Sequence, residues 1–104
     1  MRYTTCKVWT TPGAAQTRPV SPTYGDYPSI RSVVECEDCG QLWMFDVLDS
    51  EDWNDDAGGR LLWAPVPLAI GEAQVGDIHP EQVDDLTPRV VVPGHDPASA
   101  QWHR

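Results

Sequence analysis

The sequence predicts a small β-rich α+β fold: a single domain over residues 1–104, built on a three-stranded antiparallel meander with one short helix. Its 104 residues suffice for one hydrophobic core and leave no room for a second. Ten prolines and eight glycines interrupt regular structure often, so the elements must be short. Between these interruptions, apolar and β-branched residues gather in runs of strand length.

Residues 3–10 begin the expected sheet. Aromatic and apolar side chains are mixed there with β-branched threonines, which favours a strand. Residues 11–29 contain four prolines, so we expect an irregular connection rather than a helix or a continuous strand. The meander follows, with its strands expected over residues 30–36, 41–49 and 60–66.

The middle strand of the meander, residues 41–49, has the clearest pattern. Apolar side chains occupy both of its alternating faces, which is typical of a central strand or of one covered on both sides. A tight turn over residues 36–40 joins it to the preceding strand, and a loop that ends in Gly58-Gly59 joins it to the next. The core is expected to include Val33, Trp43, Phe45, Val47, Leu62, Trp63 and Val91.

The last third of the chain predicts shorter elements. A short helix is expected over residues 79–86, because Pro80 suits the first helical position and acidic residues follow it. Residues 89–92, with three consecutive valines, predict another strand. Residues 93–104 contain two prolines and a glycine and are expected to form a loose tail, with Trp102 as its candidate anchor.

The charge of the chain is concentrated in one segment. The formal net charge is −9, and residues 32–59 contain nine acidic residues and no basic one. Direct nucleic-acid binding is therefore not expected, because phosphate contacts need clustered lysine and arginine. Six carboxylates fall within residues 46–56, and like charges this close must stay solvated or meet a cationic partner.

This acidic segment has two interpretations: a solvated loop between two strands, or a docking surface for a basic protein. Trp53 favours docking, because a large aromatic side chain is costly to expose and tryptophan is enriched at binding hot spots. We therefore expect a basic protein partner. The residues expected to contact it are Asp49, Glu51, Asp52, Trp53, Asp55 and Asp56.

Cys36 and Cys39 form the most informative motif. Two thiolates separated by two residues can hold one Zn²⁺, and Gly40 directly after them suits a positive φ that turns backbone N–H groups toward the sulfurs. Over residues 33–43 this motif resembles the zinc knuckle of zinc-ribbon and rubredoxin-like modules. Those families carry a second pair of cysteines with the same spacing, which this chain lacks, so further ligands must come from elsewhere.

The expected metal site is a structural zinc bound by Cys36, Cys39, Cys6 and His79. Among the histidines, His79 is favoured because Pro80 restricts its backbone, whereas His95 and His103 fall in the expected tail. Three alternatives remain for the cysteine pair: a structural disulfide, unligated thiols, or a redox-active dithiol. Redox catalysis is disfavoured, because three flanking carboxylates raise the thiol pKa values.

The sequence lacks the common catalytic motifs, so we expect that the protein is not an enzyme. The chain has no phosphate loop, no His-Glu-x-x-His and no Gly-x-Ser-x-Gly. No apolar run approaches the roughly 18 residues of a membrane span, and the N-terminal residues lack a secretory signal. We therefore expect a cytoplasmic protein without membrane contact.

The size, the charge and the acidic segment with its tryptophan resemble small acidic inhibitors: immunity proteins and antitoxins that block cationic nucleases, and phage-type inhibitors that imitate nucleic acid. The expected function is to occlude a basic protein partner. One alternative is a zinc-ribbon-like adaptor subunit of a larger complex. Another is a small enzyme that uses the cysteine pair.

Overall fold

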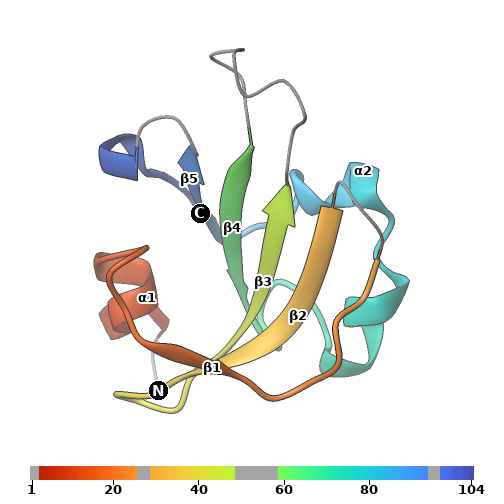
Figure 1. Cartoon of the computed structure of the whole chain (residues 1–104), viewed down its shortest axis with the longest axis horizontal. Helices are drawn as coiled ribbons and strands as arrows, with labels where there is room; N and C mark the ends of the chain where they lie inside the picture. Colours follow the sequence, from red (N-terminus) through yellow and green to blue (C-terminus); the bar gives the residue numbers. More distant parts are fainter. Residues whose placement is uncertain (1–2, 26–28, 49–58, 94–96) are drawn as a thin grey trace.

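Figure 1 shows the computed structural model of the chain, which describes residues 3–25, 29–48, 59–93 and 97–104. Six strands form one antiparallel sheet in the order β1-β2-β3-β4-β5-β6. The strands are β1 (Thr17–Pro19), β2 (Ser29–Cys36), β3 (Leu42–Leu48), β4 (Arg60–Pro65), β5 (Arg89–Pro93) and β6 (Gln101–His103). The short helices are η1 (Tyr3–Thr5), α1 (Lys7–Thr10), η2 (Glu72–Asp77), α2 (Pro80–Val83) and η3 (Pro97–Ser99).

The meander predicted from the sequence forms the centre of this sheet and extends further than expected. Strands β2, β3 and β4 pair in sequence, and their registers place Phe45 opposite both Ser32 and Trp63. Strand β1 adds to one side of the meander, and β5 and β6 add to the other. The fold is therefore β-rich, as predicted, with six strands where the sequence indicated a three-stranded core and two further strands.

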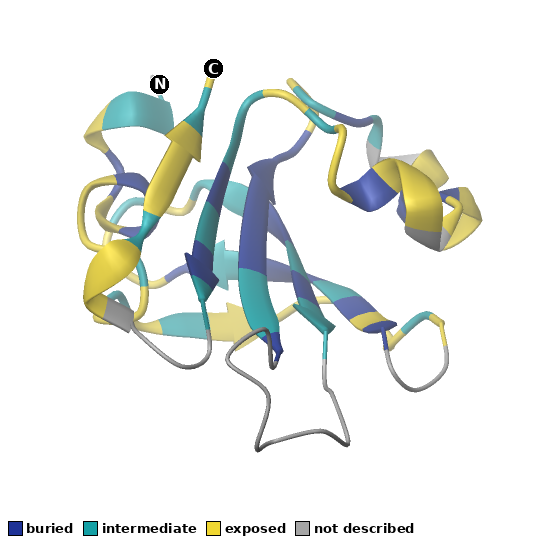
Figure 2. Cartoon of the chain, turned by 90° about the horizontal axis from the view of Figure 1, so that it is seen from above, coloured by how far each residue is buried: buried dark blue, intermediate teal, exposed yellow. Residues whose placement is uncertain are grey.

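The two faces of the sheet are both covered, as the alternation in β3 predicts. One face carries Trp43 and Trp63 and packs against Val8 and Trp9 of α1. The opposite face has Met44, Leu62, Val33, Ala64 and Val66 packed against Ile70, Val75, Ile78 and Val83 from the segment that contains η2 and α2. Figure 2 shows the buried positions running along the central strands of the sheet. Of the expected core, Phe45, Val47 and Val91 are only half-buried.

The prediction of a strand over residues 3–10 is wrong, because these residues form η1 and α1. Val8 and Trp9 are adjacent in sequence and both buried, at 1% and 3% exposure. A strand would point two adjacent side chains to opposite faces, whereas a helical turn lets both reach the same sheet face. Tertiary packing therefore overrides the local preference of the threonines for extended structure.

The C-terminal residues are also more ordered than a loose tail. Residues 101–103 form β6, which pairs with β5 and places Trp102 opposite Val90. The indole Nε1 of Trp102 donates a hydrogen bond of 2.6 Å to the carbonyl oxygen of Trp9. Trp102 thus anchors this segment to α1 in the way that the sequence suggested.

A cluster of buried charged side chains lies on the sheet face that η2 and α2 cover. Asp46 is 0% exposed and accepts hydrogen bonds from Ser29 Oγ at 3.0 Å and from Arg60 Nη1 at 2.8 Å. Arg31, 4% exposed, lies with its Nη1 3.9 Å from Asp46 Oδ2 and donates through Nε to the carbonyl of Val75 at 3.0 Å. Asp46 therefore does not belong to the solvated acidic segment in which the sequence analysis counted it.

None of the described helices has the length and apolar character that spanning a membrane requires.

Candidate metal centre

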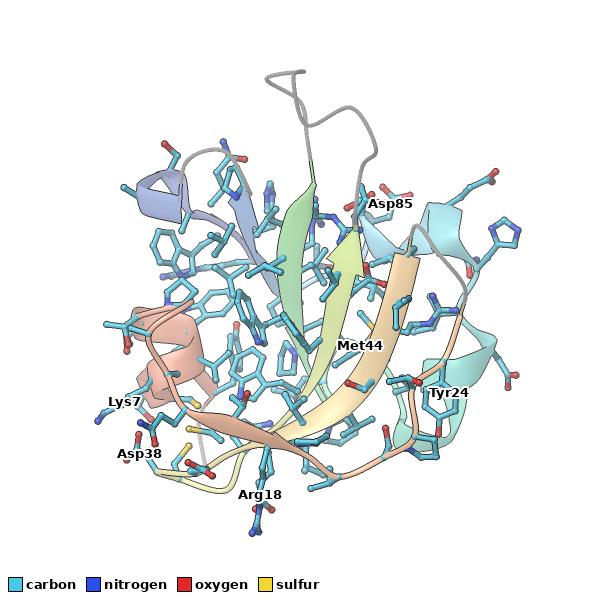
Figure 3. All side chains as sticks on the ribbon, viewed as in Figure 1. Lys7, Arg18, Tyr24, Asp38, Met44 and Asp85 are labelled. Atoms are coloured by element: carbon cyan, nitrogen blue, oxygen red, sulfur yellow. The ribbon has the colours of Figure 1, made fainter. Side chains whose placement is uncertain are left out.

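Three cysteines that are distant in the sequence converge at one end of the meander. Cys6 is the N-cap of α1, Cys36 ends β2, and Cys39 lies in the turn between β2 and β3. Their sulfur atoms all lie within 4.8 Å of one another, and the Sγ atoms of Cys6 and Cys39 are 3.2 Å apart. Figure 3 shows sulfur atoms gathered beside the labelled Lys7 and Asp38 side chains.

The turn after β2 is shaped by the backbone as the sequence predicts. Gly40 has a φ of +79°, a left-handed conformation that side chains other than glycine rarely adopt. Its N–H donates to the carbonyl of Cys36 at 2.9 Å, and the N–H of Cys36 donates to the carbonyl of Gln41 at 3.0 Å. The turn thereby fixes Cys36 and Cys39 relative to each other.

Burial and hydrogen bonding act in opposite directions on the thiols. Burial raises the pKa of Cys36, but the backbone N–H groups of Cys39 and Asp38, together with the neighbouring thiols, lower the pKa below its usual value. Burial raises the pKa of Cys6 to about 12, and the backbone N–H of Val8 and the side chain of Trp43 oppose it. The two buried thiols therefore differ: the pKa of Cys6 is raised, whereas that of Cys36 is lowered, against the expectation that the flanking carboxylates raise it.

This arrangement fits a thiophilic divalent ion. Zn–S bonds of about 2.3 Å in a tetrahedral site place sulfurs roughly 3.8 Å apart, so three sulfurs within 4.8 Å need little adjustment. A disulfide bond joins sulfurs at about 2.05 Å, whereas all three cysteines here are unbonded. The backbone N–H groups that lower the pKa of Cys36 also suit a metal-bound thiolate better than a neutral thiol or a disulfide.

The structure does not bring His79 to the three cysteines. His79 is the N-cap of α2, its side chain is 64% exposed, and its Nδ1 accepts a hydrogen bond of 3.3 Å from the backbone N–H of Glu81. His79 was favoured from the sequence because Pro80 restricts its backbone. In the structure, that restricted backbone forms the N-cap of α2. His103 lies half-buried in β6, and His95 lies outside the described residues.

Among the described residues, the group of converging ligand atoms consists of Cys6, Cys36 and Cys39. Cys6 and Cys36 are 1% exposed and Cys39 is half-buried, so the site opens to solvent at Cys39. Lys7 and Asp38 form an ion pair of 3.3 Å between α1 and the turn, next to that opening. A fourth ligand can therefore approach from the side of Cys39.

The residues predicted to bind a partner lie outside the described part of the chain. They are Asp49, Glu51, Asp52, Trp53, Asp55 and Asp56, in the connection from β3 to β4. The sequence indicated Trp43 only as a core residue, but its buried indole N–H also lies in the cluster that contains Cys6 and Cys36. One available signal was that a buried tryptophan usually needs an acceptor for its N–H.

No protein-family model, curated protein or solved structure matches this chain.

Proposed function

We propose that the chain is a small zinc-binding domain that acts as an inhibitor-type binding protein for a basic protein partner in the cytoplasm. The observation that carries the zinc site is the convergence of three cysteine sulfurs from α1, β2 and the turn after it. A single ion there joins the N-terminal helix to the central hairpin. In so small a domain, that link supplies a sizeable part of the stability.

Metal analysis tests the zinc site directly. Protein purified under reducing conditions and analysed by native mass spectrometry should contain close to one zinc ion per chain, or one per dimer if a second chain contributes a ligand. Zinc should leave on treatment with a strong chelator and return on addition of ZnCl₂. Metal-free protein that is fully folded and does not take up added zinc would refute this part of the proposal.

The charge distribution supports a basic partner. Four of the described cations have carboxylate partners outside residues 49–58: Lys7 pairs with Asp38, Arg18 with Glu35, Arg31 with Asp46, and Arg60 with Asp46 and Asp84. Arg89 instead donates to the carbonyl oxygen of Leu86. Residues 49–58 add five further carboxylates and no base. This connection starts and ends on the paired residues Leu48 and Arg60 of the central strands.

Charge reversal at Asp52 and Asp55 tests the acidic segment. We expect an Asp52→Lys, Asp55→Lys variant to lose a basic protein that wild-type protein retains from low-salt lysate and releases in a salt gradient. Once that partner is purified, its association rate at low salt should fall about tenfold or more, because electrostatic steering contributes factors of 10 to 1,000. The rate is measured by stopped-flow mixing.

The control for this variant reverses two exposed carboxylates on the segment that contains η2 and α2, which covers the sheet face of Met44 and Leu62. Asp77→Lys, Glu81→Lys changes the net charge equally and should retain the partner. Equal association rates for the two double variants would show that residues 49–58 do not form the docking surface.

A second candidate function is that of an adaptor subunit. The observation that favours it is that β1 and β6 end the sheet order, with Trp102 in β6 44% exposed. An edge strand can pair with a strand of another protein. A complex formed in this way contains several proteins and persists at high salt, whereas the basic partner of the first proposal dissociates.

A further inference from the structure

The indole N–H of Trp43 is an orphaned polar group next to the cysteines. Trp43 is 0% exposed and belongs to the same packed cluster as Cys6 and Cys36. Within the described part of the chain, its Nε1 has no conventional hydrogen-bond partner. A buried N–H without an acceptor is unfavourable and rare in folded proteins, so its presence calls for an acceptor beyond the hydrogen bonds of the described residues.

The ring of Trp43 is fixed by its neighbours. Trp43 lies in β3 between Val34 of β2 and Pro65 of β4. The ring of Trp9 stacks on it at a centroid distance of 6.3 Å and an interplanar angle of 18°, and Tyr3 meets it edge-on at 6.3 Å. An indole held in this way cannot turn its N–H toward another acceptor without disturbing the aromatic cluster.

The candidate acceptor is the sulfur of Cys6. Cys6 belongs to the same buried cluster as Trp43 and lies in the sequence between Tyr3 and Trp9, the two residues whose rings contact the ring of Trp43. A neutral thiol sulfur is a weak acceptor, whereas a thiolate accepts a charge-assisted hydrogen bond. A metal-bound Cys6, which is a thiolate, would therefore supply the acceptor that the N–H of Trp43 lacks.

We propose that Trp43 is a positioning residue of the metal centre, whose indole N–H donates to the Cys6 thiolate when a thiophilic divalent ion is bound. This inference rests on the proposed zinc site and identifies a group that compensates the buried charge of Cys6, one of its two buried ligands. Neighbouring groups that orient metal ligands typically contribute 10- to 100-fold to metal affinity. Trp43 thus combines a core position with control of metal binding.

The test uses Co²⁺ as a spectroscopic probe in Trp43→Phe and in a matched control, Trp63→Phe. Trp63 lies in the same cluster, is 7% exposed and stacks on Phe45 at 4.9 Å. We expect Trp43→Phe to bind Co²⁺ about 10- to 100-fold more weakly than wild-type protein and to shift the sulfur-to-cobalt charge-transfer band. Trp63→Phe should keep the wild-type affinity and band position while losing stability by core truncation.

Two outcomes separate this inference from the metal site on which it depends. Wild-type protein that binds neither Co²⁺ nor Zn²⁺ overturns both proposals. Wild-type binding together with unchanged affinity and band position in Trp43→Phe overturns the role of Trp43 alone and leaves the metal site standing.

A measurement on the wild-type chain covers the case in which Trp43→Phe does not fold. In ¹H–¹⁵N spectra, the indole proton of Trp43 should shift downfield and exchange more slowly with solvent when Cd²⁺ is added. An indole resonance of Trp43 that is identical in metal-free and Cd²⁺-loaded protein contradicts the proposal.

Discussion

Cys36→Ser is expected to abolish zinc binding and to lower the melting temperature by roughly 15–30 °C relative to the zinc-loaded protein. Cys36 is 1% exposed, and the backbone N–H groups of Cys39 and Asp38 act on its sulfur. A serine hydroxyl at this position offers zinc neither a soft sulfur ligand nor a negative charge. Free zinc at 1,000 times the dissociation constant stabilises the folded state by about 4 kcal/mol. For a domain of this size, each kcal/mol corresponds to about 4–8 °C.

The measurement is thermal unfolding with and without a chelator, together with the zinc content of each protein. Val34→Thr serves as the control, because Val34 lies in the same strand and cluster and is 4% exposed. This control should lose stability but keep its zinc and its response to the chelator. A Cys36→Ser protein that still holds one zinc, or a wild-type melting temperature that ignores the chelator, would contradict the prediction.

Asp46→Ala should destabilise the protein by about 3–5 kcal/mol. Asp46 is 0% exposed and lies 2.8 Å from Arg60 Nη1 and 3.9 Å from Arg31 Nη1. Arg31 is 4% exposed, so loss of the carboxylate leaves a buried guanidinium without its counter-charge. Removing one partner of a buried ion pair costs far more than the pair contributes as a whole.

Asp84→Ala is the matched control for this second prediction. Asp84 also pairs with Arg60, at 2.9 Å, but its side chain is 59% exposed, and exposed pairs contribute only about 0–1 kcal/mol. Urea unfolding at pH 7 compares the two variants with wild-type protein. If both alanine variants show the same midpoint, the buried charge cluster does not stabilise the fold as described.

The central strands were predictable because two-residue alternation and turn residues act locally. The expected strands over residues 30–36, 41–49, 60–66 and 89–92 correspond to β2, β3, β4 and β5 with small shifts at their ends. The short helix expected over residues 79–86 forms over Pro80–Val83, with His79 as its cap. These elements depend on signals that each segment carries in its own sequence.

The N-terminal helix and the buried aspartate depend instead on distant residues. Residues 3–10 contain β-branched threonines, and only packing on the sheet makes α1 the better arrangement for Val8 and Trp9. Asp46 lies two residues after Met44 and shares its face of β3, a position that indicates burial. The residue that neutralises it, Arg60, comes from the next strand, so the pairing is not visible in the local sequence. The density of acids around it in the sequence concealed that signal.

The candidate metal centre could be predicted in part from the sequence. The motif at Cys36 and Cys39 and the positive φ of Gly40 are local, and the structure agrees with both. That Cys6 joins them follows from the packing of α1 against the sheet, which local signals do not show. The role of His79 as a helix cap explains why its restricted backbone did not indicate a metal ligand.

The guanidinium of Arg31 also has a consequence for how the protein opens. It sits in β2 and donates to the carbonyls of Val75 and Ile78, the residues through which the η2 segment covers one face of the sheet. If that segment separated from the sheet, the buried guanidinium of Arg31 would lose its carbonyl acceptors. Local opening of the segment is therefore coupled to opening of β2. Protected amide hydrogens of β2 and of the η2 segment should therefore exchange with deuterium as one cooperative unit, and the η2 segment should not open independently of the sheet.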